Sequence, residues 1–227
     1  MLNEIFNLDK ILETFNYIFW FFTLNLLFWV FNIPIILFFV FIGISNILTY
    51  FPLFLVCLIP VMPTFTVILY CMNKLYKNKN IEVIPCFLRG FKLNFGQALF
   101  VWCVELVAIF LIFTNINFFS VAANSFIIPA LFICLLILIS AMTPYLFLII
   151  SRFSMTSLQV LRLSFILTFT RPLLTITNLL LVLVFMVLFE ISPAIIILFI
   201  STLLGFCLIF INRTLLSELE NISKNNN

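Results

Sequence analysis

Histidine is absent from all 227 positions of the sequence. This absence removes the commonest metal ligand, the side chain that most often acts as a general base, and the partner of a serine or cysteine nucleophile. The six cysteines are scattered, without the paired spacing typical of zinc sites or disulfide frameworks. We therefore expect no metal site, no cofactor and no enzymatic activity.

Charged residues are also scarce. Asp, Glu, Lys and Arg make up 8% of the chain and hydrophobic residues 65%, against about 25% and roughly 45 to 50% in soluble domains. A water-soluble fold could not bury so much apolar surface. The composition predicts an integral membrane protein whose main partner is the lipid bilayer, and no feature indicates binding of nucleic acid.

Long apolar runs account for most of the sequence. Each approaches or exceeds the length of about 20 residues that crosses the hydrocarbon of a bilayer as a helix. Backbone groups cannot stay unpaired in lipid and the runs lack the alternation of barrel strands, so we expect helices. The sequence predicts one transmembrane domain over residues 1–227, an all-α polytopic bundle of about six transmembrane helices with a cytoplasmic amphipathic helix. The predicted spans are residues 17–42, 47–70, 97–119, 126–150, 173–189 and 194–211.

Lysine and arginine gather in two of the connections between these spans. The first and third connections carry none, whereas the second and fourth carry Lys74, Lys77, Lys79, Arg89, Lys92, Arg152, Arg162 and Arg171. Because basic loops stay in the cytoplasm, we expect a multi-pass protein of a bacterial plasma membrane with both termini cytoplasmic. The number of crossings between residues 17 and 70 stays open, because four prolines interrupt this region.

The second connection contains the predicted amphipathic helix. After Pro85, the apolar residues Phe87, Leu88, Phe91 and Phe95 share one helical face, and Arg89 and Lys92 lie on the other. Such a helix can lie on the headgroups of an anionic leaflet or dock against a cytoplasmic partner. The three phenylalanines, Arg89 and Lys92 are our candidates for contact with a partner or with lipid headgroups.

A single acidic residue, Glu105, lies inside the third predicted span. A charge at the centre of a transmembrane helix costs about 2.5 to 3.5 kcal/mol, so such a residue is a functional candidate by default. One interpretation is a proton or cation site helped by Asn25, Asn32 and Asn178 from other spans. The other is a protonated side chain hydrogen-bonded to a neighbour.

Several short motifs resemble a known family. They are Asn25-Leu-Leu-Phe-Trp29, Pro63-Thr-Phe-Thr-Val-Ile-Leu-Tyr70 and Phe87-Leu-Arg-Gly-Phe-Lys-Leu-Asn-Phe-Gly-Gln97. With Pro144-Tyr-Leu and Ser151-Arg-Phe153, this pattern resembles the YesL-like family of bacterial membrane proteins, a domain of unknown function. The resemblance implies a multi-pass plasma-membrane protein, often encoded near sugar-uptake transporters, glycan-degrading enzymes or their sensors, with no established activity. The sequence departs from the family pattern by extra residues between Pro34 and Met62 and by Glu105, where the pattern is apolar.

Two functions follow as hypotheses. The first is an accessory or scaffold component linked to carbohydrate uptake or sensing, with sugar-transporter or sensor subunits as partners. The alternative is a small transporter or channel that uses the intramembrane Glu105. The sequence favours no particular substrate or oligomeric state.

Overall fold

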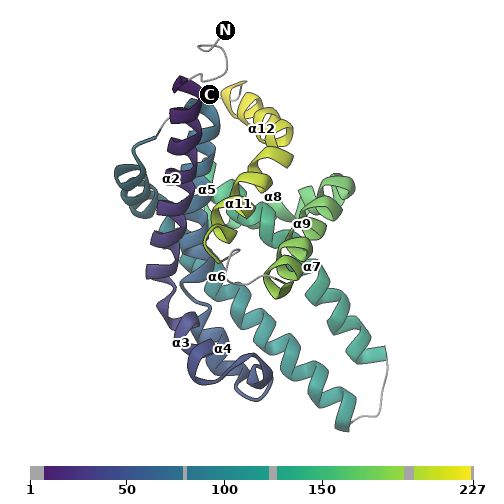
Figure 1. Cartoon of the computed structure of the whole chain (residues 1–227). Coiled ribbons are helices and arrows are strands. Elements are labelled where there is room, and N and C mark those ends of the chain that lie inside the picture. The colour runs from purple at the N-terminus through teal and green to yellow at the C-terminus, as the bar shows by residue number, and fades with distance from the viewer. Residues whose placement is uncertain (1–7, 79–80, 123–126, 192–196, 226–227) are drawn as a thin grey trace.

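The computed structural model describes residues 8–78, 81–122, 127–191 and 197–225, and they contain helices and no strand. The all-α prediction is confirmed. The elements in chain order are α2 (Leu8–Phe31), α3 (Ile33–Phe41), the 3-10 helix η1 (Ile44–Asn46), α4 (Phe51–Cys57), α5 (Val61–Asn78), α6 (Val83–Ala122), α7 (Ile127–Arg152), α8 (Ser157–Thr170), α9 (Pro172–Ile191), α11 (Ile200–Ile211) and α12 (Arg213–Asn225). Figure 1 shows their arrangement.

Four helical segments are long and apolar enough to cross a membrane: Phe51–Asn78, Val83–Ser120, Ile127–Arg152 and Pro172–Ile191. Two further pairs of helices meet the same test together but are bent at a break. Phe15–Phe31 and Ile33–Phe41 meet at 69°, and Ile200–Ile211 and Arg213–Ile222 at 60°. Four to six possible spans agree with a multi-pass membrane protein.

The bend between α2 and α3 lies where the sequence predicts a kink. Pro34 occupies the first turn of α3 and has no N–H to continue the ladder of α2. Asn32 lies at the break, and its side chain donates a hydrogen bond from Nδ2 to the carbonyl of Phe28, at 2.7 Å. The Phe28 carbonyl also accepts from the backbone N–H of Asn32 at 3.1 Å, so Asn32 adds a second, local bond at the last turn of α2.

The second predicted span, residues 47–70, is divided in the structure. It consists of α4, a break at residues 58–60 and α5, which continues past the predicted end to Asn78. Gly43 precedes η1 with φ 81°, a conformation that only glycine adopts at low cost. The prolines therefore shape this region into two short helices, α3 and α4, joined by a turn.

α6 differs from the expectation of a separate amphipathic helix followed by a span. It is one helix of 40 residues, about 60 Å along its axis, or twice the roughly 30 Å of bilayer hydrocarbon. Neither Gly90 nor Gly96 interrupts it, because glycine weakens a helix by only about 1 kcal/mol. Its first half must therefore lie along or outside the hydrocarbon.

The core lies around α5, which packs against α2, α6, α7 and α11. Its residues 63–69 are buried without interruption, so α5 is enclosed on all sides, the pattern of a helix in the centre of a bundle. Gly90 of α6 lies directly against it, because a Cβ there would be 2.7 Å from Tyr70 Cδ1. This glycine permits the close approach of α5 and α6.

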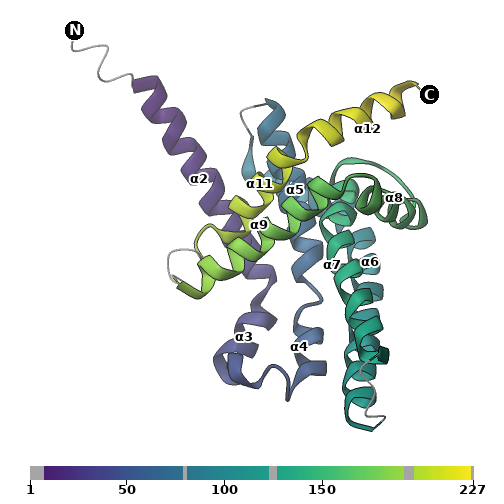
Figure 2. The ribbon, with the colours of Figure 1, turned by 90° about the vertical axis from the view of Figure 1, so that its right-hand side faces the viewer.

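The hairpin of α9 and α11 does not reach the end of the molecule where α6 ends and α7 begins. The last turn of α9 and the first turn of α11 lie near half of its height (Figures 1 and 2). The sequence had led us to expect two complete crossings, residues 173–189 and 194–211. Residues 194–196, like residue 126 of the fourth predicted span, lie outside the described part of the chain.

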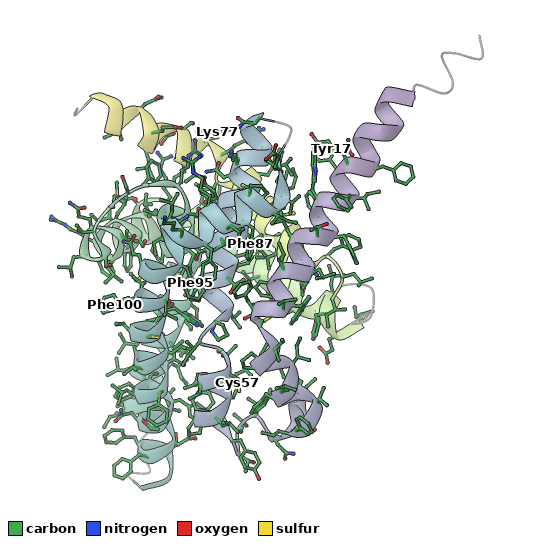
Figure 3. The ribbon with its side chains drawn as sticks, turned by 90° about the vertical axis from the view of Figure 1, so that its left-hand side faces the viewer. Tyr17, Cys57, Lys77, Phe87, Phe95 and Phe100 are labelled. Atoms are coloured by element: carbon green, nitrogen blue, oxygen red, sulfur yellow. The ribbon has the colours of Figure 1, made fainter. Side chains whose placement is uncertain are left out.

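The two ends of the molecule differ in charge. The basic end, where α5 ends, α6 begins and α12 lies, carries Lys77, Arg89 and Arg213 (Figure 2). The opposite end is formed by α3, α4, the second half of α6 and the first half of α7, which contain no lysine or arginine. Figure 3 shows Lys77 toward the basic end and Cys57 toward the opposite one.

Candidate functional site: a buried carboxylate beside an apolar cavity

Glu105 lies on α6 and is 7% exposed. The hydroxyl of Thr143, on α7, forms a hydrogen bond with Glu105 Oε1, and it also lies 3.0 Å from the carbonyl oxygen of Ile139. A hydroxyl has one proton, so Thr143 can donate to the carboxylate, or accept from a carboxylic acid and donate to Ile139. The same atoms therefore accommodate both protonation states of Glu105.

One oxygen of this carboxyl group lacks a partner. Glu105 Oε2 is buried and forms no hydrogen bond with any residue that the structure describes. Buried polar atoms are normally paired, so each exception needs an explanation. The unpaired oxygen leaves Glu105 open to a proton, a cation or a donor from a ligand.

A central cavity of about 500 Å³ lies next to this pair, and Thr143 is part of its wall. Side chains from α2 to α7, α9 and α11 enclose it, and apart from the hydroxyls of Ser140, Thr143 and Ser201 they are apolar or aromatic. The volume is that of a typical small-molecule pocket. The lining suits a hydrocarbon chain or another hydrophobic ligand far better than a sugar, whose hydroxyls need hydrogen-bond partners.

The aromatic N–H groups in the cavity wall are already used to join helices. Trp102 Nε1 donates to the carbonyl of Leu58 at 2.8 Å, in the break between α4 and α5. Trp29 Nε1 donates to the carbonyl of Ile197 at 2.7 Å. Both bonds satisfy backbone carbonyls that lie outside regular helix, as buried polar groups require.

Asn25 holds the start of α11 against α2. Its Nδ2 donates to the carbonyl of Ile197 at 2.7 Å, and its Oδ1 accepts from the backbone N–H of Ser201 at 3.2 Å and from the Ser201 hydroxyl. These bonds attach the first residues of α11 and the segment before it to α2.

The other two predicted helpers of Glu105 have separate partners. Asn178 of α9 and Asn212, at the bend between α11 and α12, form a reciprocal amide pair with N to O distances of 2.8 and 3.3 Å. Asn32 bonds to the break between α2 and α3. The structure therefore distributes Asn25, Asn32 and Asn178 over three polar clusters and brings none of them to Glu105 by a hydrogen bond.

Thr143 was not anticipated from the sequence. The nearest signal was Pro144, which follows it inside α7. Proline has no backbone N–H, so Pro144 cannot donate a hydrogen bond to the carbonyl oxygen four residues earlier, which belongs to Ser140. A threonine beside an intrahelical proline therefore marked a place where polar backbone and side-chain atoms face the protein interior.

The aromatic face predicted on the second connection packs inside the protein. Phe87 is 1% exposed, and the ring of Phe31 on α2 lies 5.7 Å from Phe87 and 5.0 Å from Phe91. Phe91 in turn stacks on Phe95 at 4.1 Å. Figure 3 shows Phe87 and Phe95 along this part of α6.

The opposite face of the same helical segment remains open. Arg89 and Lys92 are exposed, and the neighbouring Leu88 and Leu93 are 61% and 60% exposed. The prediction that Leu88 shares the face of the phenylalanines is therefore wrong. We call Leu88, Arg89, Lys92 and Leu93 the outer face of α6. It combines positive charge with apolar side chains, which suits lipid headgroups or a partner protein.

Comparison with known proteins finds a similarity over part of the chain. Residues 21–116 match the family model described as protein of unknown function, DUF624. The match includes Asn25, Trp29, Glu105 and the outer face of α6, and it ends before Thr143. No curated protein and no solved structure matches the chain.

Proposed function

We propose that this protein is an accessory or scaffold component of a bacterial plasma membrane, linked to carbohydrate uptake or sensing. The observation that carries the proposal is the outer face of α6, where Arg89 and Lys92 are exposed beside Leu88 and Leu93. The link to carbohydrate rests on the resemblance to the YesL-like family.

The outer face of α6 is held in a fixed orientation. Phe87 and Phe91 pack against Phe31 of α2 on the other side of the helix, and Gly90 lies against Tyr70 of α5. A preorganised surface loses little conformational entropy when a partner binds. Positive charge among apolar residues favours a partner segment that carries acidic and apolar side chains.

The character of the central cavity favours a helper protein over a sugar transporter. Sugar hydroxyls that leave water need hydrogen bonds in return, and the polar groups of the wall, at Trp29, Trp102 and Ser201, are already bonded within the protein. We therefore propose that a partner protein, and not this protein, binds the carbohydrate.

The test is site-specific photo-cross-linking in native membranes of cells grown on different sugars. A photoreactive residue at Leu88 or Leu93 is expected to form adducts with membrane subunits of a carbohydrate transporter or sensor. The control position is Leu111, which lies on the same helix, is 54% exposed and falls inside the predicted third span.

Reversing the charges of the outer face of α6 provides a second part of this test. Arg89→Glu with Lys92→Glu is expected to lower the adduct yield several-fold, and Arg162→Glu, an exposed cation on α8, is expected to leave it unchanged. The proposal fails if Leu88 and Leu93 form no more protein adducts than Leu111, and if deletion of the gene alters no sugar-dependent growth or induction.

A small transporter or channel is the second candidate, favoured by the unpaired Glu105 Oε2 beside the cavity-lining Thr143. Proton and cation flux into vesicles that contain the purified protein tests it. Glu105→Gln is expected to abolish the flux, and Glu190→Gln, at an exposed carboxylate of α9, to preserve it. Absence of any ion or sugar flux in the wild type contradicts this candidate.

A further inference from the structure

A second cavity lies at the basic end, away from the central one. Its volume is about 370 Å³, and α5, α7 and the first turns of α12 contribute to its wall. We call it the basic pocket. Three cationic side chains and three hydroxyl groups line it: Lys77, Arg152, Arg213, Tyr76, Thr214 and Ser217.

The charges of the basic pocket do not balance. Glu220 of α12 forms ion pairs with Lys77 at 2.9 Å and with Arg152 at 2.6 Å. The other nearby carboxylate of α12, Glu218, pairs with Arg171 at 2.6 Å. Three positive charges thus face one negative charge, and the site is suited to an additional anion.

Arg152 is only partly engaged by other protein groups. Its side chain is 11% exposed, and its Nη2 donates to Glu220. Its Nε is buried without a hydrogen-bond partner in the described part of the protein. A guanidinium presents donors in a fixed fork, so a partly engaged arginine in the pocket wall suits the oxygens of a phosphate group.

Arg213 contributes a third positive charge to the pocket. It lies at the start of α12, and its guanidinium carbon is 4.7 Å above the centre of the Phe210 ring. Among the residues that the structure describes, no carboxylate forms an ion pair with Arg213, because the two carboxylates of α12 pair with Lys77, Arg152 and Arg171. A cation held over an aromatic ring keeps its hydrogen-bond donors for another group.

The position of the pocket fits the depth of lipid phosphates. Arg152 is the last residue of α7, a helix long and apolar enough to cross a membrane. The end of such a span lies at the headgroup level, and basic pockets between helices at that level hold anionic headgroups. We propose that the basic pocket binds a phosphate group, supplied by an anionic lipid headgroup or by a soluble phosphate, between Lys77, Arg152 and Arg213.

The experiment measures binding to the full-length, delipidated protein in detergent by native mass spectrometry and by the shift in thermal unfolding temperature. The probes are phosphatidylglycerol, phosphatidylcholine as the zwitterionic control, and inorganic phosphate. Saturation by phosphatidylglycerol alone identifies the lipid as the source. Saturation by inorganic phosphate, with competition against the lipid, identifies a soluble anion.

Variants connect the binding to this pocket. Arg213→Gln is expected to weaken binding about tenfold, whereas Arg162→Gln, which removes an exposed cation from α8, is expected to match the wild type. Glu220→Gln removes the internal competitor of the anion and is expected to tighten binding several-fold, a gain that misfolding cannot produce. The proposal is overturned if neither phosphate probe binds, if Arg213→Gln and Arg162→Gln bind alike, or if Glu220→Gln fails to bind more tightly.

Discussion

At the scale of single residues, glycine placement shows how closely helices approach. Gly90 and Gly96 both lie inside α6, yet only Gly90 contacts another helix. A Cβ at residue 90 would be 2.7 Å from Tyr70 Cδ1, whereas a Cβ at residue 96 would meet nothing within 4 Å. The same residue type therefore has a packing role at one position and none at the other.

Alanine substitution separates these two roles. Gly90→Ala forces Tyr70 to move and is expected to destabilise the protein by about 1 to 3 kcal/mol, the usual cost of overpacking. Gly96→Ala is the matched control and is expected to be neutral or stabilising by about 0.4 to 1 kcal/mol, because it reduces the freedom of the unfolded chain. Unfolding monitored by circular dichroism in detergent checks both. Equal stability of the two variants would contradict the packing role of Gly90.

Asn25 is the residue that connects distant parts of the chain most directly. Asn25→Ala leaves the backbone N–H of Ser201 without its acceptor and removes one donor from the Ile197 carbonyl. The expected loss of stability is about 1 to 3 kcal/mol, the cost of an unpaired buried polar group. Asn46→Ala, whose amide bonds the Ile42 carbonyl at an exposed position, is expected to change stability by less than about 0.5 kcal/mol. Similar unfolding temperatures for both variants would refute the assigned role.

At the scale of elements, α12 is attached to the rest of the protein by apolar contacts and by charge. Its Leu215 and Leu216 are buried in the core. It lies past the bend at Asn212, and Glu218 and Glu220 pair with basic residues of other elements. Hydrogen bonds from Lys77 and Arg152 lower the pKa of Glu220 to about 2. These ion pairs are partly exposed, so salt screens them.

This attachment is expected to weaken in acid. The pKa of Glu220 is about 2 in the folded protein and about 4.3 in an unfolded chain. Its contribution to stability is therefore complete above about pH 4.3 and lost as the pH falls toward 2. The effect is small, because the Glu220 side chain is 32% exposed and solvent screens the pairs.

A fluorescent label on α12 measures its release as the pH is lowered. Glu220→Gln is the control and is expected to lack the acid-dependent step. High salt is expected to mimic acid in the wild type. If Glu220→Gln shows an acid-dependent step of the same size, the step is caused by the titration of another residue.

At the scale of the whole molecule, the charge asymmetry and the short α9–α11 hairpin predict an orientation in a bilayer. By the positive-inside rule we expect the basic end to face the cytoplasm and the hairpin to enter the bilayer from that side. Its turn is held by Asn25 and Trp29 instead of reaching the opposite surface.

Thiol labelling of intact cells tests this arrangement in a variant without the native cysteines. A membrane-impermeant reagent is expected to label Asn46→Cys in η1 from outside, and Lys77→Cys only after the cells are opened. Ile191→Cys, 72% exposed at the end of α9, is expected to stay unlabelled from outside, because the hairpin turns inside the bilayer. Labelling of Ile191→Cys as fast as Asn46→Cys would favour six complete crossings.

Composition and hydropathy were sufficient to predict helices, a membrane as solvent and a kink near Pro34, because each depends on local sequence and on the cost of unpaired backbone in lipid. The continuity of α6 was not predicted, because the sequence analysis placed the amphipathic helix in a connection and began the third span at residue 97. Glu105 was identifiable as an isolated carboxyl group in an apolar run. Its partner was not, because Thr143 lies 38 residues away on another helix.

The sequence by itself determined the fold class, the basic and neutral ends and the candidate carboxyl group. Only the tertiary structure decided which polar groups meet: Asn25 with residues 197 and 201, Asn178 with Asn212, and Glu220 with Lys77 and Arg152. The physical reason is that apolar runs specify helices in lipid without specifying their neighbours. Helix packing places the few polar side chains, and each pairs with the partner that this packing brings within hydrogen-bond distance.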